Sequence, residues 1–139
     1  RDKIQANIAV EPALMPVMIP KLILQPIVEN AIKYNHSGGK VTVKISQKKD
    51  LPAAHSKPAD YALVEVTDTG IGISPEFQEK IFDPFYRVDK SRSRAMGGAG
   101  LGLALVSEIA RQHNGQVKVT QSSEKGSTIA LILPESTDY

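Results

Sequence analysis

Four runs of residues typical of β-strands most constrain what this chain can fold into. Residues 41–46 and 61–68 are joined by a polar, proline-containing segment. Residues 116–122 and 127–134 are separated by a short turn at Glu124, Lys125 and Gly126. Apolar side chains that recur with a period of two indicate half-buried strands, and polar connections of this kind join antiparallel neighbours. We therefore expect two hairpins, and residues 4–10, which also alternate, add an edge strand.

Helical spacing marks the segments between these strands. Apolar side chains recur at helical intervals over residues 21–35. Pro26 lies inside this run, and an interior proline destabilises a helix by about 3 kcal/mol, so the helix is expected to begin near Pro26 or to be kinked there. Ser74 followed by Pro75 predicts the start of a second helix, with Ser74 as its N-cap.

A third helix is expected over residues 101–115. It would place Leu101, Leu105 and Ile109 on one face and stop at Gly115. The elements together predict an α+β fold: a two-layer sandwich of a mixed, mostly antiparallel five-stranded sheet with three helices on one face.

Composition bounds the class of protein. The chain has 139 residues, which fits a single domain spanning 1–139, with 41% hydrophobic and 23% charged residues. The net charge of +2 is too balanced to indicate a nucleic-acid partner. No apolar run approaches the roughly 20 residues that span a bilayer, and no signal peptide is evident. Cysteine is absent, which excludes disulfides and cysteine-bound metal and is compatible with the cytoplasm.

The first chemical motif lies on the helix over residues 21–35. Asn30 and Lys33 are three residues apart and Glu29 and Lys33 four apart, so their side chains share one edge of the helix. An amide oxygen beside a carboxylate suits Mg²⁺, a lysine can hold phosphate oxygens, and Tyr34 offers an aromatic face to a base. Taken alone, a solvated helix edge with a Glu29–Lys33 ion pair explains this motif better.

The second motif, Asp68-Thr69-Gly70-Ile71-Gly72, directly follows a strand. An ionised aspartate only accepts hydrogen bonds, so Asp68 suits the exocyclic amino group of adenine. A common Asp-x-Gly turn explains the same residues.

The third motif, residues 97–102, is glycine-rich and opens an apolar helix. Free amides and the helix dipole make such an N-terminus an anion site. The motif is neither a P-loop, which needs Lys-Ser/Thr after the glycines, nor a dinucleotide fingerprint, which needs a strand directly before it.

In order and spacing these motifs resemble the N, G1 and G2 boxes of the catalytic, ATP-binding domain of bacterial two-component sensor histidine kinases. That domain belongs to the superfamily of gyrase, heat-shock-protein-90, histidine kinase and MutL ATPases. Residues 80–87 resemble the F box of the sensor kinases, which gyrase-like ATPases do not carry, and residues 126–134 resemble the closing strand.

The resemblance implies a role for each matching position. Asn30 would coordinate Mg²⁺, and Lys33 would contact phosphate. Glu29 would assist as a base, order a metal-bound water or form a surface salt bridge. Asp68 would bind the adenine amino group, with Thr128 nearby at the back of the base pocket. Residues 83–99 would form an ATP lid. The remaining residues implied to contact ATP are Tyr34, Gly70, Gly72, Ile73, Phe85, Arg87, Gly98, Gly100, Leu101 and Gly102.

The resemblance also implies a reaction and partners. The domain would transfer the γ-phosphoryl group of ATP to a histidine on a separate dimerisation domain, expected upstream, and a response regulator would act downstream. None of His36, His55 and His113 has the neighbouring acidic residue of a phosphoacceptor motif, so this chain is expected to bind ATP without phosphorylating itself. It would lie in the cytoplasm, with its parent protein anchored in the bacterial membrane.

The sequence departs from the family pattern in two respects. Residues 24–30 resemble a different sensor-kinase subfamily from the one that the F box and lid resemble. Many members carry an asparagine four residues before the metal-binding one, and Pro26 stands there in this chain. Two other classes also stay open: a nucleotide-binding regulatory module without catalysis, and a serine kinase of the anti-sigma type or a gyrase-like ATPase. Intact Asn30 and Asp68 argue against the first, and Phe82 and Phe85 argue against the second.

Overall fold

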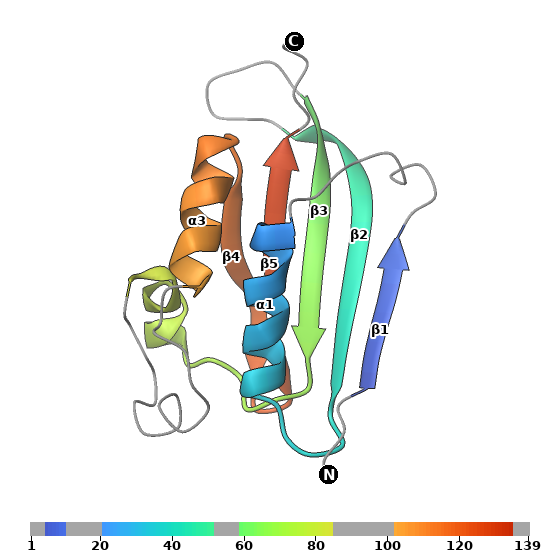
Figure 1. The fold of residues 1–139 in the computed structure, drawn as a ribbon, viewed down its shortest axis with the longest axis vertical. Helices are drawn as coiled ribbons and strands as arrows, with labels where there is room; N and C mark the ends of the chain where they lie inside the picture. Colours follow the sequence, from blue (N-terminus) through green and yellow to red (C-terminus); the bar gives the residue numbers. More distant parts are fainter. Residues whose placement is uncertain (1–4, 11–20, 52–58, 85–101, 135–139) are drawn as a thin grey trace.

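The computed structural model describes residues 5–10, 21–51, 59–84 and 102–134 (Figure 1). The elements in chain order are β1 (Gln5–Val10), α1 (Lys21–Lys33), β2 (Lys40–Leu51), β3 (Ala59–Asp68), the 3₁₀ helices η2 (Pro75–Phe77) and η3 (Lys80–Phe82), α3 (Gly102–Gln112), β4 (Gln116–Ser123) and β5 (Gly126–Pro134).

The strands form one five-stranded sheet in the order β1-β2-β3-β5-β4. β1 runs parallel to β2 at one edge, and every other neighbouring pair is antiparallel. The helices α1 and α3 lie side by side across one face of this sheet (Figure 1). The predicted α+β class, the mixed sheet and the edge position of β1 are therefore confirmed.

The core lies between that face of the sheet and the two helices. Val64 and Val66 of β3 flank Glu65, Val41 and Val43 of β2 flank Thr42, and all four valines are buried. Leu131 of β5 is 0% exposed in the middle of this layer. The helices contribute buried residues to the same cluster: Ile27, Ala31, Leu103, Val106 and Ala110. Burying one such aliphatic side chain contributes roughly 1.5–3 kcal/mol, so this layer is the main source of stability.

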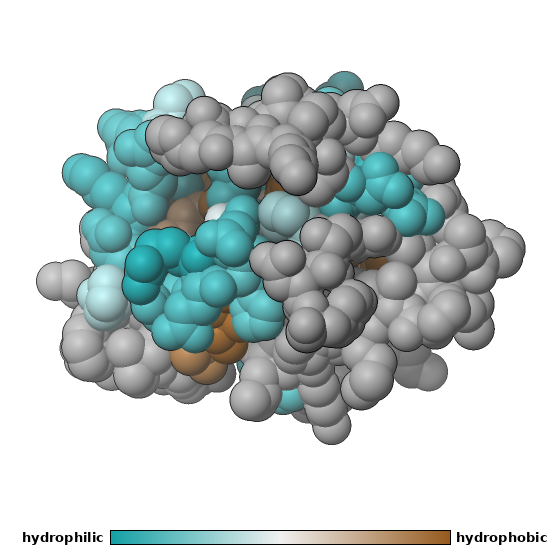
Figure 2. All heavy atoms as spheres, turned by 90° about the horizontal axis from the view of Figure 1, so that it is seen from above, coloured by the Kyte–Doolittle hydropathy of each residue, from teal (hydrophilic) through white to brown (hydrophobic). Residues whose placement is uncertain are grey.

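The surface of the described residues fits this arrangement. Figure 2 views the molecule from the end of the sheet opposite the C-terminus of β3. Hydrophilic residues cover most of the described surface there, and apolar residues show only in small areas between them. No helix among the described residues has both the length and the apolar character that crossing a bilayer requires.

The helix α3 presents a different face to the core from the one predicted. Leu103, Val106 and Ala110 are buried, whereas Leu105 is 46% exposed. Ile109 is partly buried against the core, so the predicted face is correct at that residue. Both sets of residues have helical spacing, and the packing of α3 against α1 and the sheet selects the first.

The helix α1 begins at Lys21, where the apolar spacing predicted it, and continues through Pro26, so a start at the proline is excluded. One local expectation needs correction. Ser74 does take the N-cap position with Pro75 following it, but its side chain makes no capping hydrogen bond, and the helix is a single 3₁₀ turn. Without a capping bond and with no buried residue in η2, little favours a longer helix here.

Candidate functional site

Asp68 lies at the C-terminal end of β3, where that strand meets the end of α1 and the β4–β5 turn. Three donors hold its carboxylate. The amide of Gly70 donates to Oδ1 at 2.9 Å, and the hydroxyl of Ser127 donates to Oδ2 at 3.0 Å. The amide of Ser127 also reaches Oδ1 at 3.3 Å. A carboxylate offers about four lone-pair sites, so the half-buried Asp68 is fixed in orientation and retains capacity for one further donor.

The turn after Asp68 passes close to the end of α1. A Cβ atom on Gly70 would lie 2.4 Å from the carbonyl oxygen of Tyr34, so only glycine allows this approach. The amide of Ile71 donates to that same carbonyl at 3.3 Å. The backbone of the second motif is therefore tied to the last turn of the helix that carries the first motif.

The same turn is fixed to β4 on its other side. Gly72 has a φ of 80° in the left-handed region, and a Cβ atom there would lie 2.0 Å from the carbonyl oxygen of Ser123. The amide of Ile73 donates to the hydroxyl of Ser122 at 2.6 Å, and the side-chain amide of Gln78 donates to the Ile73 carbonyl at 2.9 Å. At both glycines of the second motif, a side chain would thus clash with a neighbouring backbone carbonyl.

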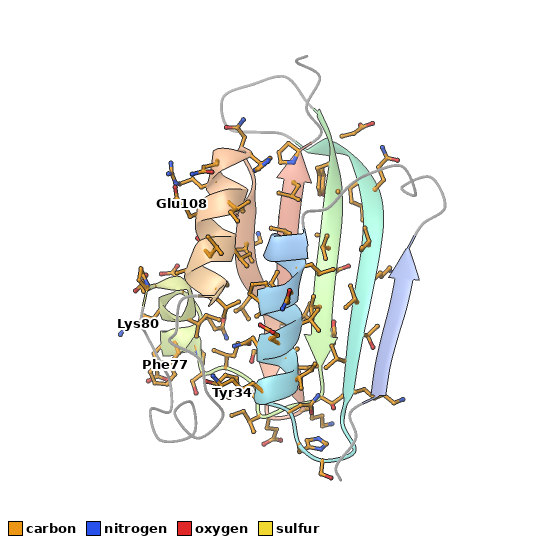
Figure 3. All side chains as sticks on the ribbon, in the orientation of Figure 1. Tyr34, Phe77, Lys80 and Glu108 are labelled. Atoms are coloured by element: carbon orange, nitrogen blue, oxygen red, sulfur yellow. The ribbon has the colours of Figure 1, made fainter. Side chains whose placement is uncertain are left out.

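The polar residues of α1 lie in its last turns, near the turn that follows Asp68. Lys33 lies in the last turn of α1 with its Nζ 5.8 Å from the centre of the Tyr34 ring, within the range of a cation–π contact. Figure 3 shows Tyr34 projecting from the end of α1 on the side of the 3₁₀ helices. Asn30 is half-buried one turn earlier, and Glu29 is exposed and accepts a hydrogen bond from Gln25 at 3.2 Å. The hydrogen-bond partner of Glu29 in the structure is thus Gln25.

Thr128 lies on the other side of the sheet from Asp68. Its hydroxyl is 2.9 Å from that of Thr67, and the two line a hollow on the face of the sheet away from the helices. Ser127, its neighbour, faces the helices and makes the contact with Asp68 that was expected of Thr128. The hydrogen bond to the Asp68 carboxylate is thus made by Ser127. The expected contact of Thr128 with ATP stays a prediction.

Of the glycine-rich motif, only the last residue, Gly102, belongs to the described part of the chain. Gly102 begins α3, and a Cβ atom on it would lie 3.1 Å from the Cβ of Pro26. The start of α3 thus packs on α1 one turn before Asn30, at the position where the family pattern often has asparagine. Other residues expected to contact ATP lie outside the described residues: Phe85, Arg87, Gly98, Gly100 and Leu101.

Two polar residues at this site were missed by the sequence reasoning. Ser127 could have been found from strand alternation. It lies two and four residues before the apolar Ile129 and Leu131, so all three side chains point to the same face of the sheet. Asn35 follows Tyr34 directly and is 6% exposed. Among the described residues no group of three or more histidine, cysteine, aspartate and glutamate side chains could hold a metal ion.

The chain belongs to the histidine kinase-, DNA gyrase B- and HSP90-like ATPase family, whose model matches residues 18–137. Sensor-like histidine kinase SenX3 of Mycolicibacterium smegmatis is 41% identical over 112 residues, and sensor histidine kinase WalK of Bacillus subtilis is 40% identical over 112 residues. Each alignment covers 81% of this chain. The aligned part is only 27% of the length of SenX3 and 17% of the length of WalK.

The fold is also that of solved histidine kinase structures. Full-length ShkA in complex with AMPPNP is 27% identical with a TM-score of 0.72, covering 97% of this chain and 26% of that one. The catalytic domain of histidine kinase ThkA is 24% identical with a TM-score of 0.69, covering 94% of this chain and 80% of that one.

Proposed function

We propose that this chain binds ATP at the end of the sheet where β3, α1 and the β4–β5 turn meet, and transfers its γ-phosphoryl group to a histidine. The observation that carries the proposal is the fixed carboxylate of Asp68, which faces the helix side of the sheet beside the polar end of α1. Membership of the ATPase family and the ShkA complex with AMPPNP support it.

The base half of the site would be built on Asp68. Its remaining acceptor capacity suits the exocyclic amino group of adenine, which is a donor, and Ser127 and Gly70 hold the carboxylate for that contact. Gly72 and Ile73 would shape the pocket, and the ring of Tyr34 would pack beside the base.

The phosphate half would be built on α1. Lys33 would contact phosphate oxygens as a point charge, and Asn30 would be a ligand of Mg²⁺. The residues fit this ion, because Mg²⁺ keeps several waters and needs one or two protein oxygens besides the phosphates. When bound, Mg²⁺ would neutralise phosphate charge. Gly98, Gly100, Leu101 and Gly102 would add backbone donors, and Phe85 and Arg87 would belong to a lid over residues 83–99.

The reaction would join a histidine ring nitrogen to the γ-phosphorus. The bond from that phosphorus to its bridging oxygen breaks, and ADP leaves. Glu29, exposed on the same edge of α1, would accept the imidazole proton. The accepting histidine would belong to a dimerisation domain of the same protein, with a response regulator downstream and the parent protein anchored in the bacterial cell membrane.

The test compares two identical substitutions on one strand. Asp68→Asn keeps the shape of the side chain but turns a donor toward the adenine amino group, so ATP affinity should fall about 10- to 100-fold. Asp60→Asn, at the far end of β3, removes the same charge and should leave affinity unchanged. Calorimetry measures both, and equal affinities would contradict the pocket assignment.

The transfer step needs a second measurement. The wild-type chain, mixed with γ-labelled ATP and a helical domain that carries a histidine beside an acidic residue, should give an acid-labile phosphoprotein. Acid-stable label would indicate serine transfer, and ATP binding without label would indicate a regulatory module.

A further inference from the structure

Asn35 is a buried residue just beyond the end of α1, and its side-chain amide makes hydrogen bonds with Lys40, His36 and Thr69. It is 6% exposed. Its Nδ2 donates to the carbonyl of Lys40 at 2.9 Å, and its Oδ1 accepts from the amide of His36 at 2.9 Å and from the hydroxyl of Thr69 at 3.2 Å. One side chain therefore joins the end of α1, the start of β2 and the turn that follows Asp68.

The turn and β2 are joined to each other without Asn35. The amide of Lys40 donates to the Thr69 hydroxyl at 2.8 Å, and the amide of Thr69 donates to the Lys40 carbonyl at 3.2 Å. Asp68 itself is held by Gly70 and Ser127. Asp68 and the turn thus keep these anchors when Asn35 is changed, and the Tyr34 carbonyl keeps its bond from the Ile71 amide.

The end of α1, unlike Asp68 and the turn, is joined to the sheet through Asn35. Asn35 and the bond from the Ile71 amide to the Tyr34 carbonyl join it to this part of the sheet. Asn30 and Lys33, the proposed phosphate half, lie on that helix. Asn35 therefore contributes to the position of the phosphate half relative to the base half, alongside the packing of Ile27 and Ala31 in the core.

We propose that Asn35 is a positioning residue that fixes the spacing between the base-binding and phosphate-binding halves of the site. This inference rests on the proposed function. The role needs an amide, because the side chain must donate to a carbonyl and accept from a hydroxyl at the same time. Aspartate keeps the shape but lacks the donor, and alanine lacks both.

ATP and adenosine distinguish this role from a general effect on folding. ATP spans both halves, whereas adenosine carries no phosphate and contacts only the base half. Loss of Asn35 should therefore weaken ATP binding about tenfold while changing adenosine affinity by less than about twofold. A smaller folded fraction would weaken both ligands by the same factor.

The experiment measures dissociation constants for ATP and adenosine by calorimetry on the 139-residue wild type, Asn35→Ala and Asn35→Asp. Urea unfolding of the same samples gives the folded fraction, and the near-isosteric Asn35→Asp serves if Asn35→Ala folds poorly. The expected result is a lower preference for ATP over adenosine in both variants. An unchanged preference in either folded variant would overturn the proposal for Asn35 and leave the proposed function standing. Failure of the wild type to bind ATP would overturn both.

Discussion

Gly72 and Gly38 form a matched pair that isolates the role of the turn after Asp68. Their φ angles are nearly equal, 80° for Gly72 and 77° for Gly38. Alanine in the left-handed region costs about 1–2 kcal/mol, and the smaller entropy of the unfolded chain offsets the same part of that in both variants. The surroundings differ, because a Cβ on Gly38 meets nothing within 4 Å, whereas a Cβ on Gly72 would lie 2.0 Å from the Ser123 carbonyl oxygen.

That contact sets the additional loss expected for Gly72→Ala. Ordinary non-bonded separations are about 3.5 Å, so the turn and β4 must separate by more than about 1 Å. The 2.6 Å bond from the Ile73 amide to the Ser122 hydroxyl would then break, which costs about another 1 kcal/mol. Because of that offset, Gly38→Ala should lower the free energy of unfolding by at most about 1–2 kcal/mol, and Gly72→Ala by about 1 kcal/mol more than Gly38→Ala.

Ligand binding should separate the two variants further. The turn carries Asp68 and Gly70, so its displacement should weaken ATP binding at least about tenfold in Gly72→Ala, and Gly38→Ala should bind normally. Urea unfolding followed by circular dichroism measures stability, and calorimetry measures affinity. Equal unfolding free energies and equal affinities in the two variants would refute the reasoning from the Ser123 contact.

Two further predictions concern the same end of the sheet and the core beneath it. Ser127→Ala removes the donor to Asp68 Oδ2 and should lower stability by about 1–2 kcal/mol and weaken ATP binding severalfold, whereas Ser127→Thr keeps the hydroxyl and both properties. Calorimetry checks this, and unchanged affinity in Ser127→Ala would show that the bond does not matter. Leu131→Ala, at 0% exposure, should cost about 2–5 kcal/mol in urea unfolding. Leu105→Ala, at 46% exposure, should change stability by less than about 0.5 kcal/mol, and equal losses would contradict the face assigned to α3.

The strand pattern predicted the sheet because alternation and pairing agree there. Val43 of β2 lies opposite Val66 of β3, so the apolar residues of both strands fall on one face. The predicted end of β2 at residue 46 was too early, since the strand continues to Leu51. Residues 47 and 48 still pair with β3, because ladder hydrogen bonds use backbone groups and do not require apolar side chains.

The face of α3 could not be predicted from spacing alone. Leu103, Val106 and Ala110 follow the same helical intervals as Leu105 and Ile109, so the sequence carries two overlapping stripes. Which stripe is buried depends on how α3 crosses the sheet beside α1, and that is a property of the assembled layers. Pro26 illustrates the same point, since its contact with the start of α3 at Gly102 joins residues far apart in the chain.

At the candidate site, strand register decides which residue meets Asp68. Asp68 lies directly opposite Ser127, and Thr67 lies opposite Thr128. Successive strand residues point to opposite faces, so a difference of one position moves a side chain from the helix side to the outer side. Position 127 therefore meets the Asp68 carboxylate, and Thr128 meets Thr67 on the outer face. Asn35 was missed for a related reason: its contact with Thr69 spans 34 residues and exists only because the end of α1, the start of β2 and the end of β3 converge at one corner of the fold.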